Sequence, residues 1–127
     1  MTNVPNDLKY TQTHEWLKVE GKNGRMGLTD YAQHQLSDIV FVEFPEIGRK
    51  AKKGEAVGVV ESVKSVSDMC VPVSGTIVEV NKALTDNLEV ISKDPYGKGW
   101  YAIIEMSDPN EVKNLMDAAA YKKHIHE

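Results

Sequence analysis

Short strand-like segments separated by glycine or proline cover most of this chain and constrain its fold more than any other feature. The segments are Glu15–Glu20, Arg25–Thr29, Asp38–Phe44, Ala56–Ser62, Val71–Val73, Thr76–Val80 and Trp100–Ile104. Short strands with turn residues between them are typical of a compact sandwich or a flattened barrel of antiparallel sheets. The sequence therefore predicts a mainly β fold.

Two of these segments carry more specific signals. The tetrapeptide Gly21-Lys22-Asn23-Gly24 follows Glu15–Glu20, and its glycines can adopt positive φ, so this region is predicted to form a hairpin. The run Asp38–Phe44 is rich in β-branched and aromatic residues and is stopped by Pro45. We expect it to form a buried strand.

Two helices are expected in addition. Thr29 is a good N-cap for a short internal helix that ends near Leu36. From about residue 108 the pattern changes, because Asp108, Pro109 and Glu111 form a helix start signal. The apolar residues that follow at helical spacing are Val112, Leu115, Met116 and Ala119. They predict one C-terminal helix that docks on the sheet.

Length and composition narrow the class of protein. With 127 residues, 41% of them hydrophobic, the chain can form a single domain over residues 1–127. It has no apolar run long enough to cross a bilayer and no signal segment. The net charge of −4 and the lack of a basic block argue against nucleic acid as a partner. One cysteine suggests a reducing compartment, so we expect a cytoplasmic protein, or a matrix protein if the source has mitochondria.

The sequence lacks the residue patterns that are typical of enzyme active sites. His14-Glu15 begins like a zinc-protease helix motif, but Lys18 stands where the second histidine belongs. His124 and His126 at the chain end are interpreted as solvated, and Cys70 as a small buried residue without an activating base. We therefore predict no catalytic residue and no metal site.

Lys64 is the most informative residue, because it lies between two strand-like segments and is predicted to project from a tight hairpin. The side chains that flank it are expected to turn inward. Most lysines in turns are simply solvated. Gly48 and Gly75, however, lie 16 residues before and 11 residues after it (64 − 48 and 75 − 64). They match the turn glycines of the lipoyl and biotinyl carrier fold.

Nearly the whole chain resembles one known family, the H-protein of the glycine cleavage system. The matching segments are Leu8–Tyr10, His14–Trp16, Gly27–Gln33, Asp38–Glu46, Glu61–Lys64, Ser67-Asp68, Pro72–Gly75, Val78–Asn81 and Asp94–Trp100. The resemblance implies a hybrid of antiparallel sheets with a helical C-terminal tail. A biotin carrier would have methionines beside its lysine, where this chain has Val63 and Ser65.

The resemblance also implies a function and a set of site residues. Lipoate would be joined to Lys64 by an amide, and recognition by the lipoate-attaching enzyme would involve Glu61 and Gly75. Thr13, Glu15 and Asp68 would line a cleft that shelters the loaded arm. The implied partners are glycine decarboxylase, aminomethyltransferase and dihydrolipoamide dehydrogenase. Gly75 has a second interpretation that stays open, namely a purely structural turn requirement.

Three other functional classes stay open at this point. A lipoyl relay protein, which donates lipoate to other lipoyl-dependent enzymes, would have the same motif around Lys64. A structural β-sandwich with an unmodified lysine is the second, and an enzyme is the third. One departure from the family pattern is Ser37, which stands where the family usually has glycine. We expect a strained left-handed helix end there.

Overall fold

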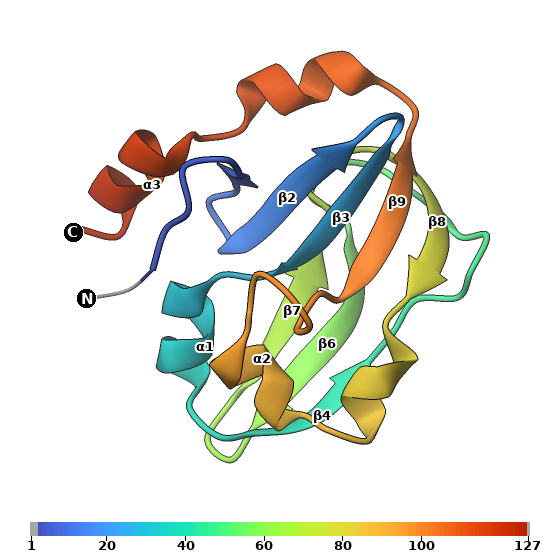
Figure 1. Cartoon of the computed structure of the whole chain (residues 1–127). Coiled ribbons are helices and arrows are strands. Elements are labelled where there is room, and N and C mark those ends of the chain that lie inside the picture. Colours follow the sequence, from blue (N-terminus) through green and yellow to red (C-terminus); the bar gives the residue numbers. More distant parts are fainter. Residues whose placement is uncertain (1–2, 127) are drawn as a thin grey trace.

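The computed structural model describes residues 3–126 and contains two antiparallel sheets (Figure 1). The six-stranded sheet has the order β1-β2-β3-β9-β8-β5, and the three-stranded sheet has the order β4-β6-β7. The strands are β1 (Lys9–Tyr10), β2 (Glu15–Glu20), β3 (Asn23–Leu28), β4 (Ile39–Glu43), β5 (Lys50–Ala51), β6 (Ala56–Ser62), β7 (Val66–Cys70), β8 (Gly75–Val80) and β9 (Ala102–Met106).

Short helices connect and flank these strands. They are α1 (Asp30–Leu36), η1 (Lys82–Thr85), α2 (Glu89–Lys93), η2 (Pro109–Asn114) and α3 (Ala118–His124), where η denotes a 3₁₀ helix. The Thr29 hydroxyl caps α1 by accepting a hydrogen bond from the Ala32 N–H at 3.1 Å. The predicted fold class, antiparallel sheets with a short internal helix and a C-terminal helix, is confirmed.

The main core lies between the two sheets. The six-stranded sheet contributes fully buried residues such as Leu17 and Ile104, and the three-stranded sheet contributes Val60 and Met69. Each such side chain stabilises the fold by about 2 kcal/mol. A second apolar cluster, which includes Tyr10, Trp16 and Tyr121, joins α3 to the six-stranded sheet. The C-terminal end is thus anchored beside β1, as Figure 1 shows.

The strand Asp38–Phe44 is not buried as expected. Val40 and Phe41 are 54% and 47% exposed, and Val42 is the only buried residue of β4. The smaller sheet packs on the core through one face, so the other face of β4 meets solvent. A register shift between Ile39 and Phe41 also turns Val40 outward. β-Branched composition predicted the strand correctly but not its burial.

The single C-terminal helix predicted from the apolar spacing is wrong. The η2 helix ends at Asn114, Leu115 is extended, and α3 begins after Asp117, whose side chain accepts from the Ala120 N–H at 2.8 Å. Between the two helices the Met116 backbone pairs with Tyr10 through two hydrogen bonds of 2.8 and 2.9 Å. This pairing and the new cap interrupt the helical repeat. Ala119, predicted to face the sheet, is exposed.

The strand expected at Val71–Val73 is also misplaced, because the observed strand is β7, which ends at Cys70. The polar residues Ser67 and Asp68 of β7 are uncommon in strands, so the sequence does not indicate a strand there. Among the helices of residues 3–126, none is long and apolar enough to span a membrane.

Candidate functional site

Lys64 lies at the exposed tip of the β6–β7 hairpin, at the lower edge of the view in Figure 1. The Ser62 N–H donates to the Ser65 carbonyl at 2.8 Å, and the Ser62 hydroxyl accepts from the backbone N–H groups of Lys64 and Ser65. The Val63 N–H donates to the Asp38 carbonyl at 3.0 Å, which ties the tip to the neighbouring chain. The backbone of the tip is therefore fixed while the lysine side chain is free to extend.

The side chains beside Lys64 do not turn inward as predicted. Val63 is 67% exposed and Val66 is 60% exposed. The tip projects beyond the core, so these valines have no apolar partner to pack against. Glu61 is half-buried and lies in register between Phe41 of β4 and Val66 of β7, on the outward face of the small sheet. A mixed apolar and acidic surface therefore surrounds the lysine.

Gly75 lies in the other sheet, at the start of β8, where it pairs with Ala51 and Met106. A Cβ atom at this position would lie 2.0 Å from the carbonyl oxygen of Glu105. The close approach of β9 thus excludes any side chain here, which gives the glycine a structural reason of its own. Its predicted part in recognition stays a prediction.

Glu15 is completely buried on β2 and accepts several hydrogen bonds. The hydroxyls of Thr11 and Thr13 donate to Oε1 at 2.6 and 2.5 Å, and the backbone N–H of Cys70 donates to Oε2 at 3.2 Å. Burial raises the pKa of this carboxyl, and the hydrogen bonds oppose that effect. These side-chain and backbone donors hold the carboxyl in place, and none of its surface is exposed.

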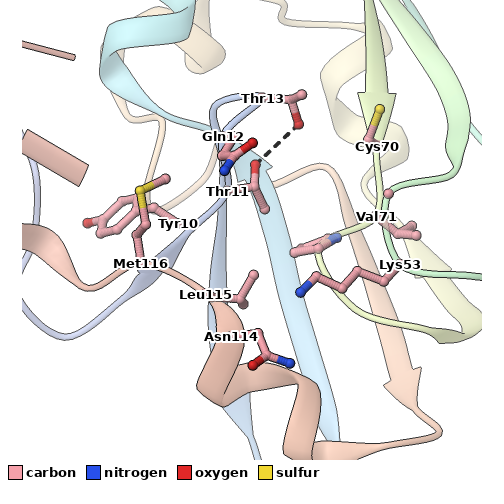
Figure 2. A pocket seen from close by; sticks show the side chains of 12 residues that line it. Tyr10, Thr11, Gln12, Thr13, Lys53, Cys70, Val71, Asn114, Leu115 and Met116 are labelled. Carbon is pink, nitrogen blue, oxygen red and sulfur yellow. Dashed lines mark hydrogen bonds between the residues drawn. The ribbon is translucent and has the colours of Figure 1, made fainter. Parts of the chain in front are cut away.

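A cavity of about 360 Å³ opens beside Thr11, Thr13 and Cys70, the three residues that donate to Glu15, which does not itself line it (Figure 2). Its lining residues are Tyr10, Thr11, Gln12, Thr13, Lys53, Gly54, Cys70, Val71, Pro72, Asn114, Leu115 and Met116. Figure 2 shows Thr11 and Thr13 on one side and Cys70 and Val71 on the other. Sequence reasoning had not placed Thr11 here. The alternation Thr11, Thr13, Glu15 in one short segment is the signal that could have found it.

The structure brings together only some of the expected cleft residues. Thr13 lines the cavity and contacts Glu15, but neither Glu15 nor Asp68 lines it. Glu15 is fully buried, and Asp68 is exposed on β7, on the same face as Cys70. Cys70 is half-buried rather than fully buried as expected. Burial raises the pKa of its thiol, and the nearby carboxylates of Glu15 and Asp68 raise it further.

The arrangement favours carrying a group over catalysing a reaction. Lys64 makes no ion pair within the described part of the chain, so its amine is accessible to acylation. Residues 3–126 hold no group of three histidine, cysteine or acidic side chains that could bind a metal. His124 is exposed, as expected, and its Nε2 lies 3.1 Å from the Gln12 carbonyl oxygen. An exposed lysine on a fixed hairpin of a β-sandwich is the arrangement expected of carrier proteins with a covalently attached arm.

Comparison with known proteins identifies the family within this class. The glycine cleavage H-protein family matches residues 8–127. The glycine cleavage system H protein of Symbiobacterium thermophilum is 57% identical, covering 95% of this chain and 94% of that protein. That of Halalkalibacterium halodurans is 52% identical, covering 100% and 99%. The crystal structure of the H protein from Mycobacterium marinum has a TM-score of 0.90 at 39% identity, covering 98% and 100%.

The chain belongs to the glycine cleavage H-protein family. It is a non-catalytic lipoyl carrier of the glycine cleavage system, and members of this family carry lipoate on a lysine. The resemblance found in the sequence is thereby confirmed, and the structural sandwich and the enzyme are excluded as functions.

Proposed function

We propose that Lys64 is the lipoate-bearing residue of this chain. The observation that carries the proposal is the exposed, unpaired amine at a hairpin tip whose backbone Ser62 holds in place. The site fits the group, because amide formation needs only an accessible amine and removes a charge that has no ion-pair partner here. Bound lipoate supplies a dithiolane that accepts the aminomethyl group of glycine.

The partners that this role requires are glycine decarboxylase, aminomethyltransferase and dihydrolipoamide dehydrogenase, together with a lipoate-attaching enzyme. Support comes from the position of Lys64, since a tip that projects beyond the core can enter a buried active site. The exposed Val63 and Val66 and the half-buried Glu61 surround the lysine and offer contacts to such partners. Recognition by the attaching enzyme is assigned to Glu61 and Gly75.

Shelter of the loaded arm is assigned to Thr13, Glu15 and Asp68. Asp68 lies on β7, four residues from Lys64 in sequence, so the two Cα atoms are at most about 14 Å apart. A lipoyl-lysine arm reaches roughly 14 Å. The exposed carboxylate of Asp68 suits an ammonium group, and Glu15 would contribute through the hydroxyls of Thr11 and Thr13, which line the cavity. These carboxylates would therefore favour a cationic load at the end of the arm.

We further assign the chain to one lipoyl-carrier domain, residues 1–127, and to the cytoplasm. Support for one domain comes from the shared core, since both sheets contribute to a single apolar cluster. The single, half-buried cysteine agrees with a reducing compartment.

The test begins with intact mass and peptide mapping after expression with lipoate or biotin. Lipoate on the peptide that contains Lys64 is expected, and none in Lys64→Arg, because arginine cannot form the amide. Lipoate on another lysine would overturn the assignment. Reconstituted glycine decarboxylation then separates the glycine cleavage carrier from a lipoyl relay protein. A lipoylated protein that does not support decarboxylation but donates lipoate would favour the relay.

Shelter is tested by ammonia release from the loaded protein after the decarboxylase is removed. Faster release is expected in Glu15→Ala and Asp68→Ala than in the unsubstituted protein. Equal release at unchanged stability would assign the protection elsewhere.

A further inference from the structure

The C-terminal helix holds the turn that precedes Glu15. Tyr121 of α3 is fully buried, and its hydroxyl lies 2.8 Å from His14 Nδ1 and 2.8 Å from Thr29 Oγ1. Its ring stacks on Tyr10 at 4.7 Å between centroids, with 12° between the planes. The Tyr121 hydroxyl thus contacts His14, in the turn before β2, and Thr29, the N-cap of α1. It connects α3 with two segments that are far away in sequence.

His14, one of these partners, has an unfavourable backbone conformation. Its φ is 72°, in the left-handed region that residues with a Cβ atom rarely adopt. Its N–H donates to the Thr11 carbonyl at 3.2 Å, and its own carbonyl accepts from the Thr29 N–H at 3.1 Å. The residue directly after it is Glu15. The conformation of His14 therefore sets the turn from which Thr11 and Thr13 reach that carboxyl.

The protonation state of the His14 ring is compatible with its hydrogen bond to the Tyr121 hydroxyl. Burial lowers the pKa of His14, and the neighbouring His124, 5.6 Å away between ring centroids, lowers it further. A neutral imidazole can present Nδ1 as an acceptor to the Tyr121 hydroxyl, which can in turn accept from Thr29.

We propose that Tyr121 is a positioning residue for Glu15. Its hydroxyl fixes the His14 side chain, which holds the strained backbone of the turn and keeps the hydroxyls of Thr11 and Thr13 on Glu15 Oε1. The inference rests on the proposed shelter of the arm by Glu15, and it adds a contribution of the C-terminal helix to the cleft. Two further contacts hold the same turn: the Met116 backbone pairs with Tyr10, and His124 Nε2 lies near the Gln12 carbonyl oxygen.

Tyr10 offers a matched control for Tyr121. It is equally buried and belongs to the same stack, but its hydroxyl donates to the Pro5 carbonyl, away from His14. Tyr121→Phe and Tyr10→Phe each remove one hydroxyl and keep the ring. Packing losses should therefore be similar in the two variants, and any difference in the cleft reports the contact with His14.

Three measurements are made on each variant: melting temperature, the NMR titration of the Glu15 carboxyl in the protein without a load, and ammonia release from the loaded protein. We expect Tyr121→Phe to change the titration of Glu15 and to accelerate release about fivefold, the effect of losing one hydrogen bond. Tyr10→Phe keeps the ring that lines the cavity and the contact with His14, so it should leave the titration of Glu15 unchanged. Any acceleration of release beyond that of Tyr10→Phe is assigned to the contact of Tyr121 with His14. Should Tyr121→Phe fold too poorly, His14→Gln removes the same contact and leaves α3 intact.

Glu15→Gln separates this inference from the function on which it rests. If Glu15→Gln accelerates release while Tyr121→Phe matches Tyr10→Phe in both readouts, the positioning role is wrong and the shelter stands. If Glu15→Gln leaves release unchanged, the shelter is wrong, and the titration alone decides on Tyr121. A shifted Glu15 titration in Tyr121→Phe then supports positioning, and an unchanged one overturns it.

Discussion

The hydroxyl oxygen of Ser62 lies 3.1 Å from the backbone nitrogen of Ser65 and accepts its hydrogen bond across the tip of the β6–β7 hairpin. The same oxygen lies 3.3 Å from the backbone nitrogen of Lys64. One serine side chain therefore satisfies two N–H groups of the exposed tip. The lysine is presented on a fixed backbone, which lowers the ordering cost of binding to an attaching enzyme.

Ser62→Ala is expected to loosen this tip. Loss of the hydroxyl should lower the free energy of unfolding by about 1 kcal/mol and slow lipoylation by more than the stability change explains. The measurement is the initial rate of lipoate attachment together with urea unfolding. Ser74→Ala is the matched control, because it removes a hydroxyl bonded to Glu111 in the loop before β8. Equal rates in the two variants would argue against the fixed tip.

Gly75→Ala is expected to destabilise the protein. The new Cβ would meet the Glu105 carbonyl oxygen at 2.0 Å, and the strands cannot separate without losing their pairing. We expect a loss of about 3 kcal/mol in the free energy of unfolding, as for an overpacked core.

Glu61→Ala, at a half-buried position of the small sheet, should slow lipoate attachment with little change in melting temperature. Slower attachment in a fully folded Gly75→Ala sample would support recognition.

Ser37→Gly is expected to stabilise the protein. Ser37 ends α1 with φ 69° and ψ −137°, and its exposed side chain makes no hydrogen bond within residues 3–126, while its N–H donates to the Gln33 carbonyl. Glycine removes the strain and keeps that backbone bond, for a gain of about 1 kcal/mol. Thermal unfolding should show a rise of about 4 °C. Ser37→Ala, which retains a Cβ, serves as the control and should show no such gain.

The strand pattern and the caps were sufficient to predict most of the fold, because local chemistry determines them. Thr29 starts α1, as expected from its residue type, and Ser37 ends it at positive φ, as expected from the glycine that the family usually has there. Burial was harder to predict. The β-branched residues of β4 look the same whether the sheet is covered on one face or on two. The outward positions of Val40 and Phe41 follow from the single covered face of the smaller sheet and from the register shift in β4.

Tertiary contacts explain the remaining differences. The apolar spacing from Val112 to Ala119 fits a helix, yet the backbone of Met116 pairs with Tyr10, more than a hundred residues away in sequence (116 − 10 = 106). The contact of Tyr121 with His14 and Thr29 has no local signal either. The hairpin lysine could be found from sequence, whereas the network behind Glu15 required the structure.

Glu15→Gln is expected to change how stability depends on pH. Burial raises the pKa of Glu15, so between the ordinary value of 4.5 and the raised value the folded protein binds more protons than the unfolded chain. The free energy of unfolding must then fall as pH rises through this window. His14 acts in the opposite direction, because its pKa is lowered and stability rises with pH below its ordinary value of 6.5.

Comparison with the glutamine variant isolates the contribution of Glu15, since His14 is present in both proteins. Urea unfolding from pH 4 upward should show the unsubstituted protein losing stability relative to Glu15→Gln as pH rises above about 4.5. Below that pH the two proteins should differ by a constant, because the carboxyl is then protonated in both folded and unfolded states. A difference that does not vary with pH would show that Glu15 titrates normally, and that Thr11, Thr13 and Cys70 fully offset its burial.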